Sequence, residues 1–405
     1  MTVEIPTRPQ SVVLSGVRTP FGKLHGGLAS KSAVELGGIV IGEAIARAGI
    51  AAGDVQHVIM GHVLQGGTGQ IPSRQAAFLA GLDRTVTSET INRVCGSGMR
   101  AITLADTLVR CEDHDVIVAG GMESMSNAPY LLRKARAGYR MGDGVLEDMM
   151  VGDGLTCAVA GVHMGVHGGN VAAEEGVDRQ EQDQWALRSH QRAIAAQDDG
   201  RNAAEMIPVN VASKRETVVV DRDESPRRDT SAEALGKLKP VFDPESTVTA
   251  GNAPGVNDGA GAVVVASAAW AEGRGIEPLA RIVSHGAAAW DVPYLAYTPA
   301  MAATLALTKA GLTVDDIDLF EINEAFASVA LISMRRLGAP CDKVNVNGGA
   351  VAIGHPLGAS GARLVITLIH ELRRRGGGLG LAAICSGGGQ GDAIILDVPA
   401  PRTGT

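Results

Sequence analysis

Two tetrapeptides of the sequence recur at nearly the same distance along the chain. Arg-Ala-Gly-Ile at 47–50 returns as Lys-Ala-Gly-Leu at 309–312, 262 positions later. Ser-Gly-Met-Arg at 97–100 returns as Ser-Gly-Ala-Arg at 360–363, 263 positions later. One such match would be a coincidence, but two matches that keep their spacing indicate duplication of a whole unit. The fold must therefore accommodate two similar halves.

Each copy shows the same order of hydrophobic patterns. Apolar periodicity predicts a helix, a strand, a second helix opened by glycine and a buried strand in both copies. The first helix and the two strands are expected at 33–48, 55–60 and 116–119 in the first copy, and at 300–310, 317–322 and 381–384 in the second. Because the last strands are continuous apolar runs, helices should cover both faces of the sheet, and the fold class is α/β.

The two copies differ in length, which predicts an insertion. The first copy, at 10–275, is much longer than the second, at 277–398. Its middle is rich in Met, charge and loop residues, and long excursions on a rigid scaffold commonly cover a binding site. We expect an N-terminal half at 1–124 and 251–276, an inserted loop domain at 125–250 that covers a substrate, and a C-terminal half at 277–405.

Composition excludes several classes of function. The net charge of −8 and an aromatic content of 3% argue against a nucleic-acid partner, which would need basic and stacking surfaces. No apolar stretch is long enough to span a bilayer, and residues 1–10 resemble neither a signal nor a transit peptide, which predicts a cytoplasmic protein without a membrane partner. The five cysteines include no Cys-x-x-Cys pair, so neither a disulfide framework nor a metal site is indicated.

Cys95 is the first candidate for catalysis. It stands in Asn-Arg-Val-Cys-Gly-Ser-Gly at 92–98, just before a helix expected from Met99. Free N–H groups and the dipole at the start of a helix favour a thiolate, which is the nucleophilic form. Gly96 and Gly98 are expected to leave room beside the sulfur. A buried, inert cysteine is the alternative.

Two glycine-rich loops of the second copy carry the next candidates. His355 lies in the loop 347–358 directly before Pro356, where an imidazole could take a proton from a nearby thiol. A structural histidine fits the same pattern. Cys385 ends the strand 381–384 and precedes Ser-Gly-Gly-Gly, whose unobstructed N–H groups suit an oxyanion site. A packed cysteine before a turn is the alternative there.

A fourth segment, Glu-Ile-Asn-Glu-Ala-Phe at 321–326, places the Asn323 amide and the Glu324 carboxylate where a strand stops. Its alternative interpretation is a helix N-cap. Together, and in this order, the four segments resemble the thiolase family, and the similarity runs from Arg-Thr-Pro-Phe-Gly at 18–22 to the Cys385 loop. The resemblance implies a five-layered αβαβα body made of two duplicated halves, with a loop domain inserted in the first.

The resemblance also implies roles for these residues. Cys95 would carry an acyl group, His355 would activate it, and Cys385 would move a proton at the α-carbon of a second substrate, which is ping-pong chemistry. One oxyanion site would use His355 and a water held by Asn323. The other would use the backbone N–H groups of Cys95 and Gly387.

The implied substrates are acyl-CoA thioesters, with no metal and no permanently bound cofactor. The reaction would be the reversible condensation of two acetyl-CoA to acetoacetyl-CoA, or thiolysis of a 3-ketoacyl-CoA. Arg227 lies in the stretch 214–239, where basic and acidic residues are nearly balanced, and is the candidate for a nucleotide phosphate; a solvated mixed-charge loop is the alternative. The other expected contacts to coenzyme A and the acyl group are Leu155, His163, Met164, Ala250, Ala253, Gly255, Ala325 and Phe326.

The chain departs from the family pattern at three places. Pro254 replaces a usual serine, 167–169 is atypical, and 295–298 brings the bulky Tyr297 near the part of the channel that would measure acyl length. The open alternatives are a degradative thiolase of broad or longer chain length and a non-catalytic acyl-CoA or lipid-binding protein. Family resemblance implies a homodimer of strand-paired subunits, or a homotetramer through part of 125–150.

Overall fold

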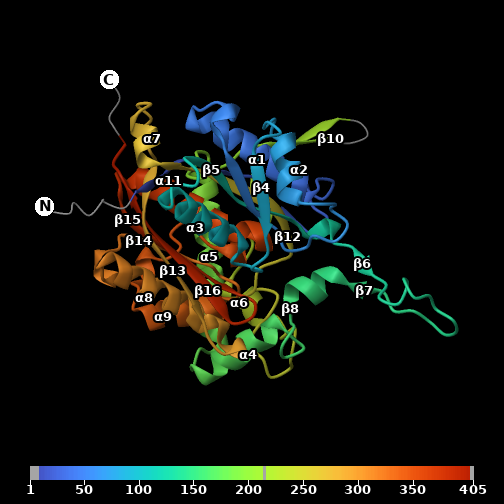
Figure 1. Ribbon diagram of the computed structural model, residues 1–405. Coiled ribbons are helices and arrows are strands. Elements are labelled where there is room, and N and C mark those ends of the chain that lie inside the picture. The colour runs from blue at the N-terminus through green and yellow to red at the C-terminus, as the bar shows by residue number, and fades with distance from the viewer. Residues whose placement is uncertain (1–8, 213–215, 402–405) are drawn as a thin grey trace, which may run out of the picture.

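A large mixed β-sheet runs through both halves of the protein (Figure 1). The computed structural model describes residues 9–212 and 216–401. The strands lie in the order β14-β15-β16-β13-β1-β12-β5-β3-β4, and β2 pairs with β12. Their bounds are β1 Ser11–Arg18, β2 Gly22–Lys23, β3 His57–Gly61, β4 Thr87–Ile91, β5 Val116–Ser124, β12 Asn257–Ser267, β13 Ala280–Ala289, β14 Leu319–Ile322, β15 Gly378–Ser386 and β16 Gln390–Val398.

The two halves of this sheet meet at a short seam. β1 pairs with β13 through only Val12 and Val13, opposite Arg281 and Ala280. By contrast, β1 pairs with β12 along nearly its whole length, and β13 does the same with β16. Each half is therefore held mainly by its own ladder, and the helices between the halves complete their contact.

Helices form three layers around the two half-sheets. α3 (Ser97–Arg110) and α11 (Leu357–Arg375) pack on each other and contact strands of both halves. α1 (Ala33–Ala48) and α2 (Pro72–Leu79) cover the outer face of the N-terminal half, while α8 (Thr298–Ala310) and α9 (Ala327–Leu337) cover that of the C-terminal half. The layers read αβαβα, which confirms the fold expected from the sequence.

The repeated tetrapeptides perform the same structural task in each copy. Gly49 ends α1 and Gly311 ends α8, with φ of 66° and 68°, a left-handed conformation that glycine adopts without strain. Gly98 and Gly361 lie where α3 crosses α11. A Cβ on Gly98 would approach the backbone nitrogen of Ala362 to 2.8 Å, and one on Gly361 would approach that of Met99 to 2.3 Å. The repeat therefore marks helix ends and a close helix crossing.

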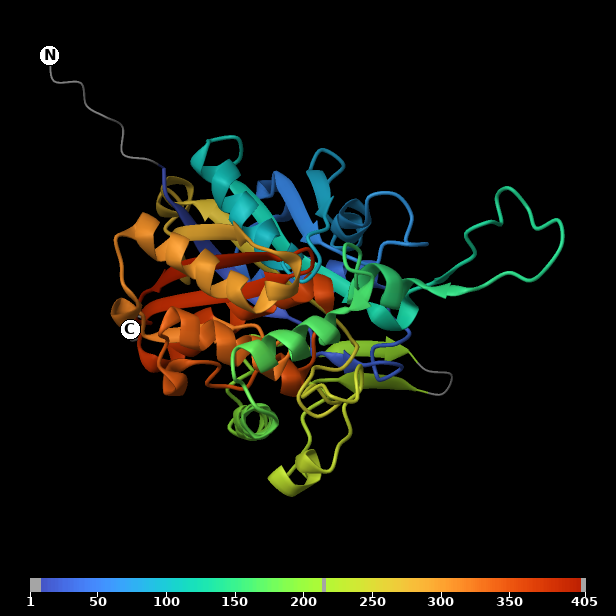
Figure 2. The ribbon, with the colours of Figure 1, turned by 90° about the horizontal axis from the view of Figure 1, so that it is seen from below.

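The chain between β5 and β12 leaves the layered body. Two helices of this segment, α4 and α5, pack against the C-terminal half, and an extended arm between β6 and β7 projects away from the molecule (Figures 1 and 2). The elements are β6 Tyr130–Leu131, β7 Glu147–Asp148, β8 Thr156–Cys157, β9 Val162–His163, α4 Met164–Glu174, α5 Arg179–Asp198, β10 Val209–Ala212, β11 Thr217–Val220 and α6 Ala232–Gly236. The bounds 125–250 expected for the inserted domain stay a prediction.

A buried arginine fastens this segment to the sheet. Arg18, the last residue of β1, lies 2.7 Å from Glu205 and 2.7 Å from Asp223 through its Nε and Nη1. The side chains are buried, and these carboxylates raise the pKa of Arg18 against the opposing effect of its burial.

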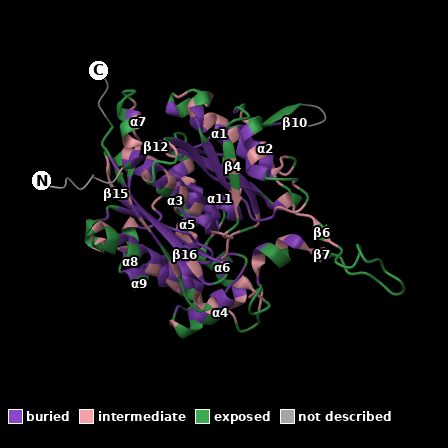
Figure 3. Cartoon of the chain, viewed as in Figure 1, coloured by how far each residue is buried: buried purple, intermediate pink, exposed green. Residues whose placement is uncertain are grey.

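Figure 3 shows the buried sheet beside the exposed arm. Within 9–212 and 216–401, no helix is both long and apolar enough to cross a membrane.

Candidate active site

One cavity of about 570 Å³ is lined by residues of both halves and of the segment inserted between β5 and β12. Four of the five residues expected to do chemistry line it, namely Cys95, His355, Cys385 and Gly387. Seven expected substrate contacts line it as well: Leu155, His163, Met164, Ala253, Gly255, Ala325 and Phe326. The fold thus brings both cysteines and the histidine into one place.

Cys95 sits in a strained turn between β4 and α3. Val94 has φ of 44°, which is rare for a β-branched residue and costs about 1–3 kcal/mol. Ser97 stabilises the turn, because its Oγ accepts from the N–H of Arg93 at 2.8 Å and donates to the carbonyl of Val94 at 2.6 Å. The turn brings Cys95 to the cavity just before the first residue of α3.

The glycines beside Cys95 lie at close contacts with the C-terminal half, and the expected room beside the sulfur stays a prediction. A Cβ on Gly96 would lie 2.9 Å from Oδ2 of Asp392, and a Cβ on Gly98 would lie 2.8 Å from the carbonyl oxygen of Gly358. Both glycines let parts of the C-terminal half approach the Cys95 turn. Their role is contact between the halves.

The thiol of Cys95 is neutral near pH 7 in the substrate-free protein. Burial raises its pKa to about 12, although hydrogen bonds from the N–H groups of Cys95 and Gly387 lower it in part. The sequence predicted a stabilised thiolate from the helix terminus. That prediction is wrong here because the loss of hydration outweighs these hydrogen bonds. Cys95 therefore needs a base.

His355 has the geometry of that base. Its Nδ1 lies 2.6 Å from Oγ of Ser360, and this hydroxyl donates to the carbonyl of Pro356 at 2.8 Å. Since the hydroxyl proton is used, Nδ1 must carry the imidazole proton and donate to Ser360, which assigns the tautomer. The Nε2 atom then has a free lone pair, and it has no partner among the described residues.

The environment keeps His355 unprotonated. Burial, aided by the positive charge of Arg363, lowers the pKa of His355 to about 3. Its backbone N–H donates to Oδ1 of Asn257 at 3.0 Å, and Gly354, with φ of 107°, packs against the same amide. The loop is thus anchored to β12, in the N-terminal half.

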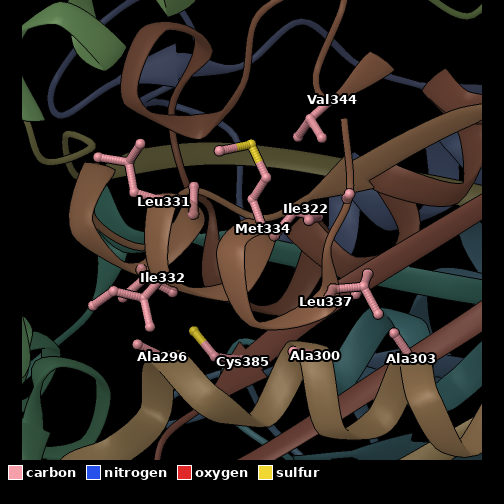
Figure 4. Close-up of a cluster of buried hydrophobic side chains, with 14 of the residues drawn as sticks. Ala296, Ala300, Ala303, Ile322, Leu331, Ile332, Met334, Leu337, Val344 and Cys385 are labelled. Atoms are coloured by element: carbon pink, nitrogen blue, oxygen red, sulfur yellow. The ribbon is translucent and has the colours of Figure 1, made fainter. Parts of the chain in front are cut away.

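Cys385 has a more apolar environment than Cys95. It lies near the end of β15, paired with Gly391, and packs in a hydrophobic cluster that includes Ala296 and Ile332 (Figure 4). Burial raises the pKa of its thiol well above the usual value, and a negative charge on Cys95 would raise it further. The two sulfurs are therefore close enough to interact electrostatically.

Asn323 is buried behind this cavity and does not line it. Its backbone N–H donates to Ala383 at 2.9 Å, while neither polar atom of its side chain has a partner within the described part of the chain. An unsatisfied buried amide costs about 1–3 kcal/mol, so this group is suited to hold a small polar molecule such as water. Its role stays a prediction.

Glu324 supports the site in a way that the sequence did not indicate. Its carboxylate accepts from the Trp185 indole at 3.0 Å, Ser189 Oγ at 2.8 Å, Asn345 Nδ2 at 3.0 Å and the Val351 N–H at 3.0 Å. It thus joins α5 to the loop before His355. The N-cap alternative is wrong, because α9 begins at Ala327 without a side-chain cap. No local pattern reveals partners more than 130 residues away.

Comparison with known proteins shows the family to which this chain belongs. The model of the thiolase N-terminal domain matches residues 11–269, and that of the thiolase C-terminal domain matches residues 276–398. The chain belongs to the thiolase family. Thiolases are acyltransferases, so the protein is an enzyme.

Several relatives resemble this thiolase along almost their whole length. The acetyl-CoA acetyltransferase of Escherichia coli K12 is 50% identical over 387 residues, covering 95% of this chain and 98% of that protein. The acetyl-CoA acetyltransferase of Pseudomonas aeruginosa is 48% identical over 386 residues, covering 95% of this chain and 98% of that protein. The crystal structure of the Bacillus anthracis acetyl-CoA acetyltransferase, 40% identical, superposes with a TM-score of 0.95 and covers 96% of this chain and 99% of that one.

The remaining expected contacts of the thiolase line a neighbouring cavity. Arg227 and Ala250 border a hollow of about 240 Å³ that shares Ala253 and Gly255 with the cavity at the cysteines. Lys23 adds a second basic side chain to this hollow, and Nδ1 of His190 accepts from the backbone N–H of Arg227 at 3.2 Å. The two cavities thus share part of their wall at 253–256.

The departures from the family pattern have different structural outcomes. Pro254 and Leu295 line the cavity. Tyr297 does not, because its hydroxyl donates to Glu175 at 2.6 Å and the guanidinium of Arg336 lies 3.3 Å from its ring centre. Of the segment 295–298, only Leu295 lines the cavity. Near 167–169, a Cβ on Gly168 would meet the Phe326 ring at 2.9 Å, so this glycine allows α4 to pack closely.

Proposed function

We propose that this thiolase condenses two acetyl-CoA molecules to acetoacetyl-CoA and coenzyme A, and runs the reverse thiolysis, through an acyl group on Cys95. The observation that carries the proposal is the free Nε2 of a neutral His355 in the same cavity as two neutral thiols. The names of the relatives in E. coli and P. aeruginosa support acetyl-CoA as the substrate.

In the first half-reaction, Cys95 attacks the carbonyl carbon of acetyl-CoA while its proton moves to Nε2 of His355. With the thiol pKa near 12 and the imidazole pKa near 3, a free thiolate–imidazolium pair is unfavourable, so proton transfer should accompany attack. The N–H groups of Cys95 and Gly387 support the tetrahedral oxyanion. When the carbon–sulfur bond to coenzyme A breaks, the leaving thiolate takes the proton from His355.

In the second half-reaction, Cys385 acts as a base on the methyl group of a second acetyl-CoA. The proton passes to its sulfur, and His355 with a water held by Asn323 supports the enolate oxygen. The enolate carbon attacks the acetyl carbonyl on Cys95, and the Cys95 sulfur leaves to give acetoacetyl-CoA. Since both thiols begin neutral, the pair must lose one proton to solvent before the first condensation. In each later turnover, the proton that Cys385 takes from the methyl group passes to the Cys95 thiolate as it leaves, and the Cys385 thiolate is restored.

A chain-length series tests the substrate. We expect thiolysis of acetoacetyl-CoA to exceed that of 3-ketoacyl-CoA with eight or more carbons by about 10-fold or more, because an apolar pocket separates acyl groups by 1–3 kcal/mol per methylene. Equal rates along the series would favour the degradative alternative. Binding of acetyl-CoA without an acetyl adduct on the Cys95 peptide in mass spectrometry would favour the non-catalytic one.

We further propose that the enzyme forms homodimers or homotetramers. β4 lies at the edge of the sheet, and the adjacent α2 exposes Phe78 and Leu79. The arm between β6 and β7 exposes Met141 and Val145. Light scattering on the intact chain and on a chain lacking the tip of the arm would test both contacts, with loss of the tetramer alone expected from the deletion. The cytoplasmic location remains a prediction for cell fractionation.

A further inference from the structure

Arg93 connects the Cys95 turn to the Cys385 hairpin through two separate contacts. Its guanidinium Nε lies 3.0 Å from Oδ2 of Asp392, on β16. Its backbone carbonyl accepts a hydrogen bond from the Ser386 hydroxyl, directly after Cys385. The residue two positions before one thiol thus holds the hairpin that carries the other.

Asp392 is placed to control the position of Cys385. In the ladder between β15 and β16 it is paired with Ile384, and its neighbour Gly391 is paired with Cys385. The carboxylate of Asp392 is buried, and Oδ2 occupies the space that a side chain on Gly96 would fill. Burial raises the pKa of Asp392, and the positive charges of Arg93 and Arg100 oppose this rise.

The two half-reactions depend on this contact to different degrees. Cys95 and His355 are anchored to the same side of the molecule, through the turn closed by Ser97 and through the bond from His355 to Asn257. Cys385 belongs to the ladder of the C-terminal half, which meets the other half-sheet only at the short seam between β1 and β13. The Arg93–Asp392 ion pair links the two halves of the protein next to the two thiols.

We propose that Arg93 and Asp392 are positioning residues that set the separation of the two thiols, and that losing their ion pair impairs condensation more than acylation. The inference rests on the proposed function. The Asp392→Asn variant keeps the bond between Ser386 and the Arg93 carbonyl, so Gly387 stays near Cys95 for the first half-reaction. The variant loses the ion pair that connects β16 to Arg93.

Two rates measured on the same enzyme test the proposal. Acylation of Cys95 by acetyl-CoA is followed by quenched-flow mass spectrometry of its peptide, and condensation by the formation of acetoacetyl-CoA. For Asp392→Asn we expect condensation to fall about 100-fold and acylation by no more than about 10-fold, because small displacements of reacting groups are costly. Asp397→Asn, an exposed position on the same strand, is the matched control and should leave both rates unchanged.

Arg93 supplies variants that separate positioning from folding. Arg93→Met removes the charge at a side chain that is 21% exposed and keeps the main-chain contact, while Arg93→Lys keeps the charge. We expect Met to reproduce the unequal loss and Lys to recover a large part of condensation. An equal fall in both rates, no fall in either, or a Lys variant no better than Met would overturn the proposal. Wild-type enzyme without an adduct on Cys95 would instead refute the proposed function itself.

Discussion

The two cysteines of the site occupy opposite kinds of structure. Cys95 lies in a strained turn before a helix, half-buried and within reach of two backbone N–H groups. Cys385 lies at the end of a strand, fully buried in an apolar cluster. A thiol that must attack a carbonyl needs access and N–H donors, whereas a thiol that takes a proton from carbon is a stronger base where burial raises its pKa. The difference supports the proposed roles, with Cys95 as the nucleophile and Cys385 as the base.

The largest effect should come from Cys95→Ser, which removes the thiol that is proposed as the nucleophile and so tests the first side of this comparison. A serine hydroxyl is a far weaker nucleophile than a thiol here, so we expect turnover to fall by about 10⁴-fold or more. Binding of coenzyme A, measured by calorimetry, should be nearly unchanged because the side chains have similar size. Retained turnover would contradict the assignment.

Cys385→Ala should separate the two halves of the reaction. Condensation is expected to fall by about 10³-fold, the range of general acid–base catalysis, while acetyl transfer to Cys95 persists. Mass spectrometry of the Cys95 peptide after mixing with acetyl-CoA provides the measurement. If the adduct disappeared together with condensation, the two thiols would not have separate roles.

A smaller effect is expected from Ser360→Ala, which sharpens the comparison on the Cys95 side. Without the hydroxyl, Nδ1 of His355 loses its acceptor and the imidazole its preferred tautomer. We expect acylation to slow by about 10-fold, equivalent to one hydrogen bond. Thr367→Ser, a comparable small change farther along α11, serves as the control. An unchanged acylation rate would remove Ser360 from the mechanism.

The smallest change should appear in the pH dependence of acylation. Because the pKa of His355 is lowered to about 3, the imidazole stays neutral as the pH falls from 8 to 5, and protonation begins only near its own pKa. The acylation rate should therefore show no inflection near pH 6.5, where an ordinary histidine titrates. Quenched-flow measurements across this range, with the fold monitored by circular dichroism, would reveal one if the assignment were wrong.

The sequence predicted the architecture well because the information was local and repeated. The glycines at 49 and 311 end helices, and those at 98 and 361 permit a helix crossing, so the duplicated tetrapeptides report two constraints of the backbone. The helix expected at 33–48 coincides with α1. Four polar loops in the right order also indicated the thiolase family, whose two domain models match the chain.

What the sequence did not predict depends on distant neighbours. The pKa of Cys95 follows from burial by both halves, which outweighs the local rule for a helix terminus. The side chain of Tyr297 does not line the cavity, because its hydroxyl donates to Glu175 and its ring contacts the guanidinium of Arg336. Ser360 is the exception, because it lies only five residues after His355. In the sequence it was noticed only as part of the repeated tetrapeptide.

The short seam between β1 and β13 has a consequence for how activity arises during synthesis. The proposed nucleophile is translated early, whereas the proposed base and Gly387 lie on the β15–β16 hairpin of the second copy. On the proposed mechanism, a nascent chain that contains only the first copy has Cys95 but neither His355 nor Cys385. Catalytic activity should therefore arise only when the β15–β16 hairpin has joined the second half-sheet.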